Sequence, residues 1–407
     1  MSNLEKFISK SVQSVPPSGI RKFFDIVSEM KDALSLGVGE PDFVTPWNIR
    51  EMGIYSIEEG HTHYTSNFGL LELRKEISRY LKDRFDLDYP NYRDQILVTV
   101  GASEAIDIAL RSIIDPGDEV LIPEPCFVSY KPCVIFAGGV PVEIETKPEN
   151  DFKLRAEDIL PKISSRTKAI ILSYPNNPTG AIMTKDDLKE IVDILKDKEI
   201  IVISDEIYAE LTYEGSHISI ANFSEMKERT IVINGFSKAF AMTGWRLGFV
   251  AANEVFIKAM AKVHQYIIMS APTFSQYAAI EALRNGLLEV EKMRDEYNRR
   301  RRYMVSRFNK MGLECFEPKG AFYVFPSIKS TGLSSEEFAE RLLHEQKVAV
   351  VPGTAFGSSG EGFIRCSYAY SIETIKHALD RIEKFVLNLK TQGVFQQTHK
   401  NNVVVEK

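Results

Sequence analysis

The chain has 407 residues, a length that predicts two or three domains at roughly 150 residues each. Hydrophobic residues make up 44% and charged residues 26%, so a large core can form without disulfides or metal ions. The formal net charge of −6 argues against nucleic acid and anionic membrane surfaces as partners.

The amino-terminal residues MSNLEKFISKS lack the apolar stretch of a signal peptide, and the apolar runs Ala169–Leu172 and Ile200–Ile203 are too short to span a bilayer. The chain has four cysteines, Cys126, Cys133, Cys315 and Cys366. They form no CxxC pair or Cys/His cluster, so we expect reduced thiols and no metal site. These features predict a soluble, cytoplasmic protein.

Short runs rich in isoleucine and valine predict strands at Ile96–Val100, Glu119–Ile122, Ala169–Ser173, Ile200–Ser204, Thr230–Ile233 and Leu247–Ala251. The runs show little polar alternation, which is typical of strands buried on both faces. Between two of them, Thr184 and Asp187 have the spacing of a capping box that begins a helix. Strand–helix–strand repetition predicts an α/β fold, in which helices cover a central, mostly parallel sheet.

The pattern changes after about Met293. A long charged helix is expected over roughly Leu287–Met311, and further helical patterns flank the short apolar segments VAVV and GFIRCS. This part predicts a smaller α+β domain. The tail after about Lys390 is polar and aperiodic, so we expect it to be mobile.

Two short motifs could indicate other functions, namely nucleic-acid binding and metal binding. The run Arg299–Arg302 could suggest nucleic-acid binding, but consecutive helical residues point in different directions, so we expect a solvated helix face. His61 and His63 could bind a metal ion, but no third ligand is nearby in the sequence. We expect this pair on the surface or at an interface.

Four segments carry polar residues in patterns suited to chemistry: Ser173–Gly180 (SYPNNPTG), Ser204–Tyr208 (SDEIY), Gly235–Gly248 (GFSKAFAMTGWRLG) and Gly362–Ser367 (GFIRCS). The first three begin where predicted strands end. Ligands bind outside the carboxyl ends of parallel strands, so we expect these segments to converge.

In this order and spacing, the segments resemble those of the fold type I aminotransferases of class I/II, which use pyridoxal 5′-phosphate (PLP). The resemblance runs from Ser18 to about Leu387. It is strongest to bacterial enzymes for aromatic amino acids or N-acetyl-diaminopimelate, through the sequences SGIRKF, VHQY and GAFYVFPSIKS. It implies a large PLP-binding domain over residues 46–286, a small discontinuous domain over 1–45 and 287–390, and a mobile tail over 391–407.

The resemblance assigns catalysis to three residues. Lys238 would form a Schiff base with PLP and then carry the substrate proton; desolvation and nearby cations would lower its pKa, as a nucleophilic amine requires. Asp205 would pair with the pyridinium nitrogen and keep it protonated. Tyr208 would donate a hydrogen bond to the phenolate O3′, a role shared with Asn177, while Asn176 would support the turn before Pro178.

Further cofactor contacts are implied. The phosphate would bind Arg246, Ser237 and the helix N-terminus at Gly101, Ala102 and Ser103, because free N–H groups there favour an anion. Phe127 would stack on the pyridine ring. Tyr64 would reach the phosphate of the neighbouring subunit, which implies a homodimer with active sites at its interface.

For the substrate, Arg365 resembles the arginine that binds the α-carboxylate, with Gly39 and Asn177 beside it. Arg246 and Arg365 are thus both expected in a buried cleft. Tyr266 falls where dicarboxylate-specific relatives place a side-chain arginine, which weakens an aspartate-only interpretation. Arg21 could meet a distal carboxylate, but we expect it to be a surface arginine.

The implied activity is a ping-pong transfer of an amino group from an L-amino acid to a 2-oxo acid, with 2-oxoglutarate the expected acceptor. The donor could be aromatic, aspartate-like or N-acetyl-diaminopimelate. One alternative is a PLP-dependent C–S β-lyase on the same fold, which would keep every cofactor residue and release ammonia and pyruvate. A ligand-sensing regulator would need a helix-turn-helix domain, for which too few residues precede the first motif.

Overall fold

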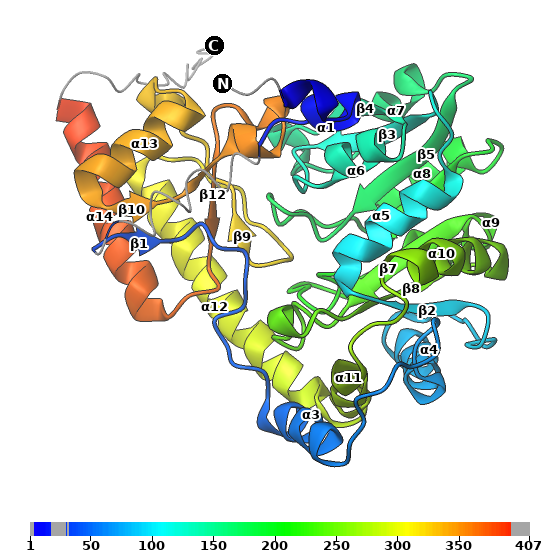
Figure 1. Ribbon diagram of the computed structural model, residues 1–407. Helices are drawn as coiled ribbons and strands as arrows, with labels where there is room; N and C mark the ends of the chain where they lie inside the picture. Colours follow the sequence, from blue (N-terminus) through cyan, green and yellow to red (C-terminus); the bar gives the residue numbers. More distant parts are fainter. Residues whose placement is uncertain (1–3, 18–29, 31, 392–407) are drawn as a thin grey trace, which may run out of the picture.

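The computed structural model describes residues 4–17, 30 and 32–391. Within these residues, a seven-stranded sheet has the order β2-β8-β7-β6-β5-β3-β4 (Figure 1). Its strands are β2 (Ile96–Thr99), β3 (Glu119–Glu124), β4 (Val140–Glu145), β5 (Thr167–Ser173), β6 (Ile201–Asp205), β7 (Thr230–Gly235) and β8 (Gly248–Ala251). Strand β8 runs antiparallel to both neighbours, and the other adjacent pairs are parallel. The predicted α/β architecture is therefore confirmed.

All six predicted strands form, and their ends differ from the prediction by no more than two residues. The prediction missed β4, which lies at the edge of the sheet. Most of its side chains are exposed or half-buried, and it contains Pro141, which cannot donate to a sheet ladder. An edge strand of this kind lacks the continuous apolar run that marks the buried strands.

Helices cover both faces of the sheet. One face packs against α5 (Gly101–Ile113), α6 (Tyr130–Phe136) and α10 (Glu254–Ile267) through a cluster of buried aliphatic side chains. The other packs against α7 (Ala156–Ile159), α8 (Lys185–Leu195) and α9 (Ser224–Lys227). The capping box predicted at the start of α8 is present, with Thr184 and Asp187 bonded to each other's backbone N–H groups.

The rest of the chain forms α1 (Lys10–Gln13), α3 (Trp47–Glu58), α4 (Leu71–Phe85), α11 (Thr273–Asn285), α12 (Leu287–Met311), α13 (Ser335–Gln346) and α14 (Ile372–Thr391). Strand β12 (Ile364–Ser367) lies between β9 (Tyr323–Val324) and β11 (Val351–Pro352) in an antiparallel sheet. Strand β1 (Leu34–Ser35) pairs with β10 (Val348–Ala349), far along the chain (Figure 1). This pairing supports the small discontinuous domain that we propose over 1–45 and 287–390, beside a large domain over 46–286.

The arginine run on α12 corrects one prediction. Arg299 and Arg302 are exposed as expected, but Arg300 and Arg301 are buried. Arg300 pairs with Asp42 at 2.8 Å, and Arg301 donates to the carbonyl oxygen of Pro318 at 2.7 Å. Consecutive residues lie about 100° apart around a helix, so a run of four necessarily places some side chains on the buried stripe.

The remaining expectations concern the histidine pair, membrane-spanning segments and the two ends of the chain. His61 and His63 are exposed, and the described part of the chain holds no cluster of metal-ligating side chains. None of its helices combines the length and apolar character that crossing a membrane requires. The segment with Arg21 and the tail over 392–407 lie outside the described residues.

Candidate functional site

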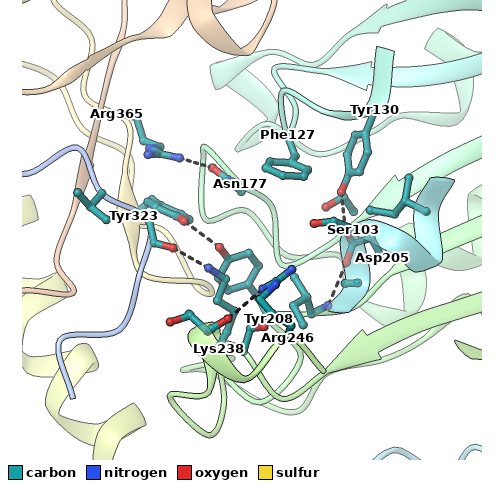
Figure 2. A pocket seen from close by; sticks show the side chains of 18 residues that line it. Ser103, Phe127, Tyr130, Asn177, Asp205, Tyr208, Lys238, Arg246, Tyr323 and Arg365 are labelled. Carbon is teal, nitrogen blue, oxygen red and sulfur yellow. Dashed lines mark hydrogen bonds between the residues drawn. The ribbon is translucent and has the colours of Figure 1, made fainter. Parts of the chain in front are cut away.

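A cavity of about 290 Å³ opens where β5, β6 and β7 end, beside the N-terminus of α5 and strand β12 (Figure 2). Its lining is formed by Val38, Gly39, Ala102, Ser103, Ile106, Phe127, Tyr130, Ser173, Asn177, Asp205, Ile207, Tyr208, Ser237, Lys238, Thr243, Arg246, Tyr323 and Arg365. The segments predicted to converge at the strand ends therefore do so.

Lys238 follows β7, and its Nζ donates a hydrogen bond to the carbonyl oxygen of Gly39 at 2.6 Å. Burial, together with the positive charges of Arg365 and Arg246, lowers the pKa of Lys238 from 10.5 to about 8, against opposing effects of Glu40 and Asp205. Desolvation and nearby cations are the two influences predicted from the sequence. The site thus holds a lysine that loses its proton more readily than a surface lysine.

Asp205 is the last residue of β6 and is buried. Burial raises its pKa to about 6, while hydrogen bonds from the Tyr130 hydroxyl and the Ile207 amide oppose that rise. The Tyr130 hydroxyl donates to Oδ2 at 2.7 Å, and the Ile207 N–H donates to Oδ1 at 3.2 Å. A buried carboxylate held in this way is suited to a cationic partner in the cavity.

Two tyrosines meet across the cavity. The hydroxyl groups of Tyr208 and Tyr323 lie 2.8 Å apart, and burial raises the pKa of both phenols, so both stay protonated at neutral pH (Figure 2). The Tyr323 hydroxyl would lie 2.3 Å from a Cβ atom at Gly39. Only glycine at this position leaves room for the tyrosine.

Arg365 extends from β12 and is 3% exposed. Its Nη1 donates to Asn177 Oδ1 at 2.8 Å, and its Nη2 donates to the Gly37 carbonyl oxygen at 2.6 Å. The guanidinium carbon lies 4.4 Å from the ring centre of Tyr323 and 4.7 Å from that of Phe356. The two rings and two hydrogen bonds fix the guanidinium plane, while its buried Nε atom has no hydrogen-bond partner among the described residues.

The start of α5 lies against Arg246. Gly101 has φ +79°, and a Cβ atom there would lie 2.8 Å from Arg246 Nη2. A Cβ atom on Gly248 would lie 2.7 Å from the Ala102 amide nitrogen. Glycines therefore permit the close approach of β8, Arg246 and the first amides of α5. This arrangement forms a cradle of N–H donors, suited to an oxyanion.

Eleven of the thirteen predicted site residues line the cavity: Gly39, Ala102, Ser103, Phe127, Asn177, Asp205, Tyr208, Ser237, Lys238, Arg246 and Arg365. Gly101 lies behind it, against Arg246. Tyr64 is 81% exposed and lines a neighbouring hollow that Arg246 also borders. Tyr266 is 84% exposed and does not line the cavity.

One expectation about the arginines is corrected. Arg365 is buried as expected, but Arg246 is exposed; it directly follows the short turn η5 (Thr243–Trp245) and borders both the cavity and the neighbouring hollow. Asn176 has the turn role that was predicted: its Oδ1 accepts hydrogen bonds from the N–H and the hydroxyl group of Thr179.

The sequence interpretation missed Tyr130 and Tyr323. Both stand in segments with a recognisable pattern, PCFVSY and GAFYVF, but each segment holds two aromatic residues or more. Spacing alone does not say which ring faces the cavity. Ser173 could have been found, because it is the last residue of β5 and begins the SYPNNPTG segment.

Comparisons with known proteins identify the family of this chain. The family model described as aminotransferase class I and II matches residues 31–382. An aspartate aminotransferase of Pyrococcus abyssi is 50% identical, over 94% of this chain and 99% of the relative. An aromatic-amino-acid aminotransferase of Thermococcus litoralis is 47% identical over the same shares.

A solved structure of similar shape is the aromatic aminotransferase of Pyrococcus horikoshii, with a TM-score of 0.87 and 46% identity over 91% of this chain and all of that one. The family match spans most of the chain, and both relatives are covered nearly from end to end. The chain therefore belongs to the class I and II aminotransferases, enzymes of fold type I that use pyridoxal 5′-phosphate.

Proposed function

We propose that this aminotransferase moves the amino group of an L-α-amino acid to 2-oxoglutarate in a ping-pong mechanism centred on Lys238. The observation that carries the proposal is the placement of Lys238, which has a lowered pKa and lines the same cavity as Asp205 and Arg365. A nucleophilic amine, a buried carboxylate and an anion-binding guanidinium are the groups that this chemistry needs.

The residues present fit PLP. The cradle of Arg246 and the first amides of α5 suits a phosphate, and the glycines at 101 and 248 keep it free of Cβ atoms. Asp205 lines the same cavity and suits the pyridine nitrogen, and Phe127 supplies an aromatic face there. When bound, PLP supplies an electron sink for the bonds at the substrate Cα.

Lys238 has two roles in this proposal. Its pKa of about 8 leaves roughly a tenth of the amine neutral at pH 7, so that it can bind the cofactor aldehyde covalently. With PLP and a substrate bound, the freed Lys238 amine would move the proton between the substrate Cα and C4′ of the cofactor.

The residues around the ring position the cofactor. Asp205 holds the proton on the pyridine nitrogen, and Tyr130 keeps that carboxylate oriented through the 2.7 Å hydrogen bond. Tyr208 and Asn177 donate to O3′. Asn177 can do so while it holds Arg365, because its Oδ1 accepts from the guanidinium and its Nδ2 is left to donate.

Arg365 binds the α-carboxylate of the substrate. Its plane is already fixed by Tyr323, Phe356 and two hydrogen bonds, so little order is lost when the carboxylate arrives. Gly39 provides a backbone N–H close by, where a larger residue would collide with Tyr323.

The donor that we propose has an aromatic side chain. Among the described residues, the cations that line the cavity are Lys238, Arg246 and Arg365, and each already has a role. A distal carboxylate, as in aspartate, would need another cation. The aromatic ring of Tyr323 favours an apolar or aromatic group instead, and one of the relatives is named for aromatic donors.

A panel of amino donors tests the proposal. Purified protein with PLP is assayed with phenylalanine, tyrosine, tryptophan, aspartate and N-acetyl-diaminopimelate, each against 2-oxoglutarate and against pyruvate. We expect aromatic donors to give the highest kcat/KM with 2-oxoglutarate, and Lys238→Ala to be inactive with every pair. A preference for aspartate would reject the donor assignment, and a preference for pyruvate would reject the acceptor. With an amino acid that carries a Cβ–S bond, steady release of ammonia and pyruvate when no oxo acid is added would instead favour a β-lyase.

We further propose a homodimer in which Tyr64 reaches the partner's phosphate cradle. Tyr64 is 81% exposed and shares its hollow with the exposed side chains of Ile268 and Phe274, and Phe274 also lines a second hollow with the exposed Ile54. Exposed apolar patches of this kind mark interaction surfaces.

We also propose the cytoplasm as the location of the enzyme. The four cysteines are free thiols, which supports this proposal because disulfides are rare in the cytoplasm.

Mixed dimers test the interface. Chains with Tyr64→Ala and chains with Lys238→Ala are unfolded together, refolded and assayed at limiting PLP. If Tyr64 acts across the interface, the mixed dimer contains one site with both native residues, and activity recovers. No recovery above that of the separate variants would place Tyr64 in its own subunit's site or outside both.

A further inference from the structure

A buried polar pair lies behind the phosphate cradle, in the apolar layer between α10 and α5. His264 on α10 is 0% exposed, and its Nδ1 lies 2.6 Å from Oε1 of Glu104, in the first turn of α5. The apolar cluster that packs α5 and α10 against the sheet includes Ala105 of α5 and Met260 of α10. A leucine would fill such a place without the cost of burying a polar ring, so the histidine calls for a reason beyond packing.

Glu104 links this histidine to the turn that begins α5. Its second carboxylate oxygen, Oε2, accepts a hydrogen bond from the Val100 N–H at 2.5 Å. Val100 directly precedes Gly101, whose positive φ brings it against Arg246. The Thr99 hydroxyl secures the same turn by donating to the Gly101 carbonyl oxygen at 3.0 Å. The conformation of the cradle therefore depends on the orientation of the Glu104 side chain.

We propose that His264 is a positioning residue for the cofactor phosphate, acting through Glu104. With both oxygens engaged, the carboxylate stays out of the cavity, whose lining does not include it. A carboxylate released in the first turn would be free to accept from the amides at 101–103, and its negative charge would repel the phosphate dianion. The inference rests on the proposed function, because it requires the phosphate to bind at the start of α5.

Two cofactor forms and two substitutions test it. The ligands are PLP and pyridoxal, which lacks the phosphate, and the readout is the Kd of each for the apoprotein. His264→Leu removes the Nδ1 donor to Glu104 and fills most of the same space with an apolar side chain. His264→Asn keeps a donor, because the amide Nδ2 takes the place of Nδ1. The ring makes no other hydrogen bond among the described residues, so His264→Leu deletes one bond only.

We expect His264→Leu to weaken PLP binding about tenfold, which corresponds to about 1.4 kcal/mol, and to leave pyridoxal binding within twofold. His264→Asn should recover most of the loss. Ile257→Ala is the matched control, because it loosens the same buried cluster of α10 without touching the pair. It should lower the thermal midpoint and leave the ratio of the two Kd values unchanged.

Two results would overturn the proposal. One is an equal loss of affinity for PLP and pyridoxal in His264→Leu; the other is the same change of ratio in Ile257→Ala, since loosened packing would then explain it. Failure of the proposed function has a different signature. If the phosphate does not bind at α5, the wild-type protein itself would bind PLP no more tightly than pyridoxal.

Discussion

Lys238 destabilises the cofactor-free protein at neutral pH, and its removal should therefore stabilise that form. Burial and the charges of Arg365 and Arg246 lower the pKa of Lys238 from 10.5 to about 8 in the folded state. This drop corresponds to about 3 kcal/mol. Between pH 8 and 10.5 the unfolded chain holds one proton more than the folded one, so the free energy of unfolding rises with pH across this window. Below pH 8 the full cost is present.

Replacing the amine with a neutral side chain, Lys238→Met, removes that cost. It also removes the hydrogen bond from Nζ to Gly39, worth about 1 kcal/mol, so a net gain of about 2 kcal/mol is expected at pH 7. At about 2.1 cal/mol/K for each of 407 residues, the gain raises the thermal midpoint by about 2 °C.

The assay is the thermal midpoint of the apoproteins, followed by circular dichroism from pH 6 to pH 11. The difference between Lys238→Met and the wild type should be greatest below pH 8 and should shrink as the pH approaches 10.5. Lys376→Met, at an exposed position on α14, is the control and should leave the midpoint unchanged. A variant midpoint at or below that of the wild type at pH 7, with parallel pH curves, would refute the reasoning.

Three further predictions concern separate parts of the site. Arg365→Ala should raise KM for the amino donor at least tenfold, while the Kd for PLP changes little. Steady-state kinetics and a PLP titration measure the two constants. A raised Kd for PLP with an unchanged KM would reject the carboxylate role. The raised pKa of Asp205 makes the apoprotein lose stability as the pH rises from about 4 to about 6. Tyr130→Phe removes a hydrogen bond that opposes the rise in the Asp205 pKa, so the loss of stability should continue to about one pH unit higher. Thermal midpoints measured against pH check this, and a profile identical to that of the wild type would contradict it. Gly248→Ala forces a Cβ atom against the first turn of α5 and should weaken PLP binding about tenfold, whereas Gly244→Ala, in open space, should not; equal effects in a PLP titration would exclude the cradle argument.

The fold could be predicted to the extent that burial leaves a mark on the sequence. The inner strands are continuous apolar runs because both of their faces are covered, and the start of α8 is marked by its own capping box. Strand β4 left no such mark, because an edge strand tolerates polar residues and proline. The burial of Arg300 and Arg301 depends on partners supplied by distant loops, which no local pattern contains.

The residues of the site also differ in whether a local sequence pattern marks them. Lys238, Asp205 and Asn177 stand in short motifs at strand ends, so sequence and topology together bring them to one edge. Tyr130 and Tyr323 were missed because their hydroxyl contacts arise from the packing of separate elements. The exposure of Arg246 was also missed, because its motif does not show that it borders two hollows at once.

The central claim is that PLP binds covalently to Lys238, and one measurement tests it most directly. The purified protein with PLP is reduced with borohydride, digested and mapped by mass spectrometry, with and without prior addition of an amino donor. We predict a phosphopyridoxyl group on Lys238 in the untreated sample, and its loss after the donor has been added. A label on another lysine, or a label that the donor does not remove, would contradict the account.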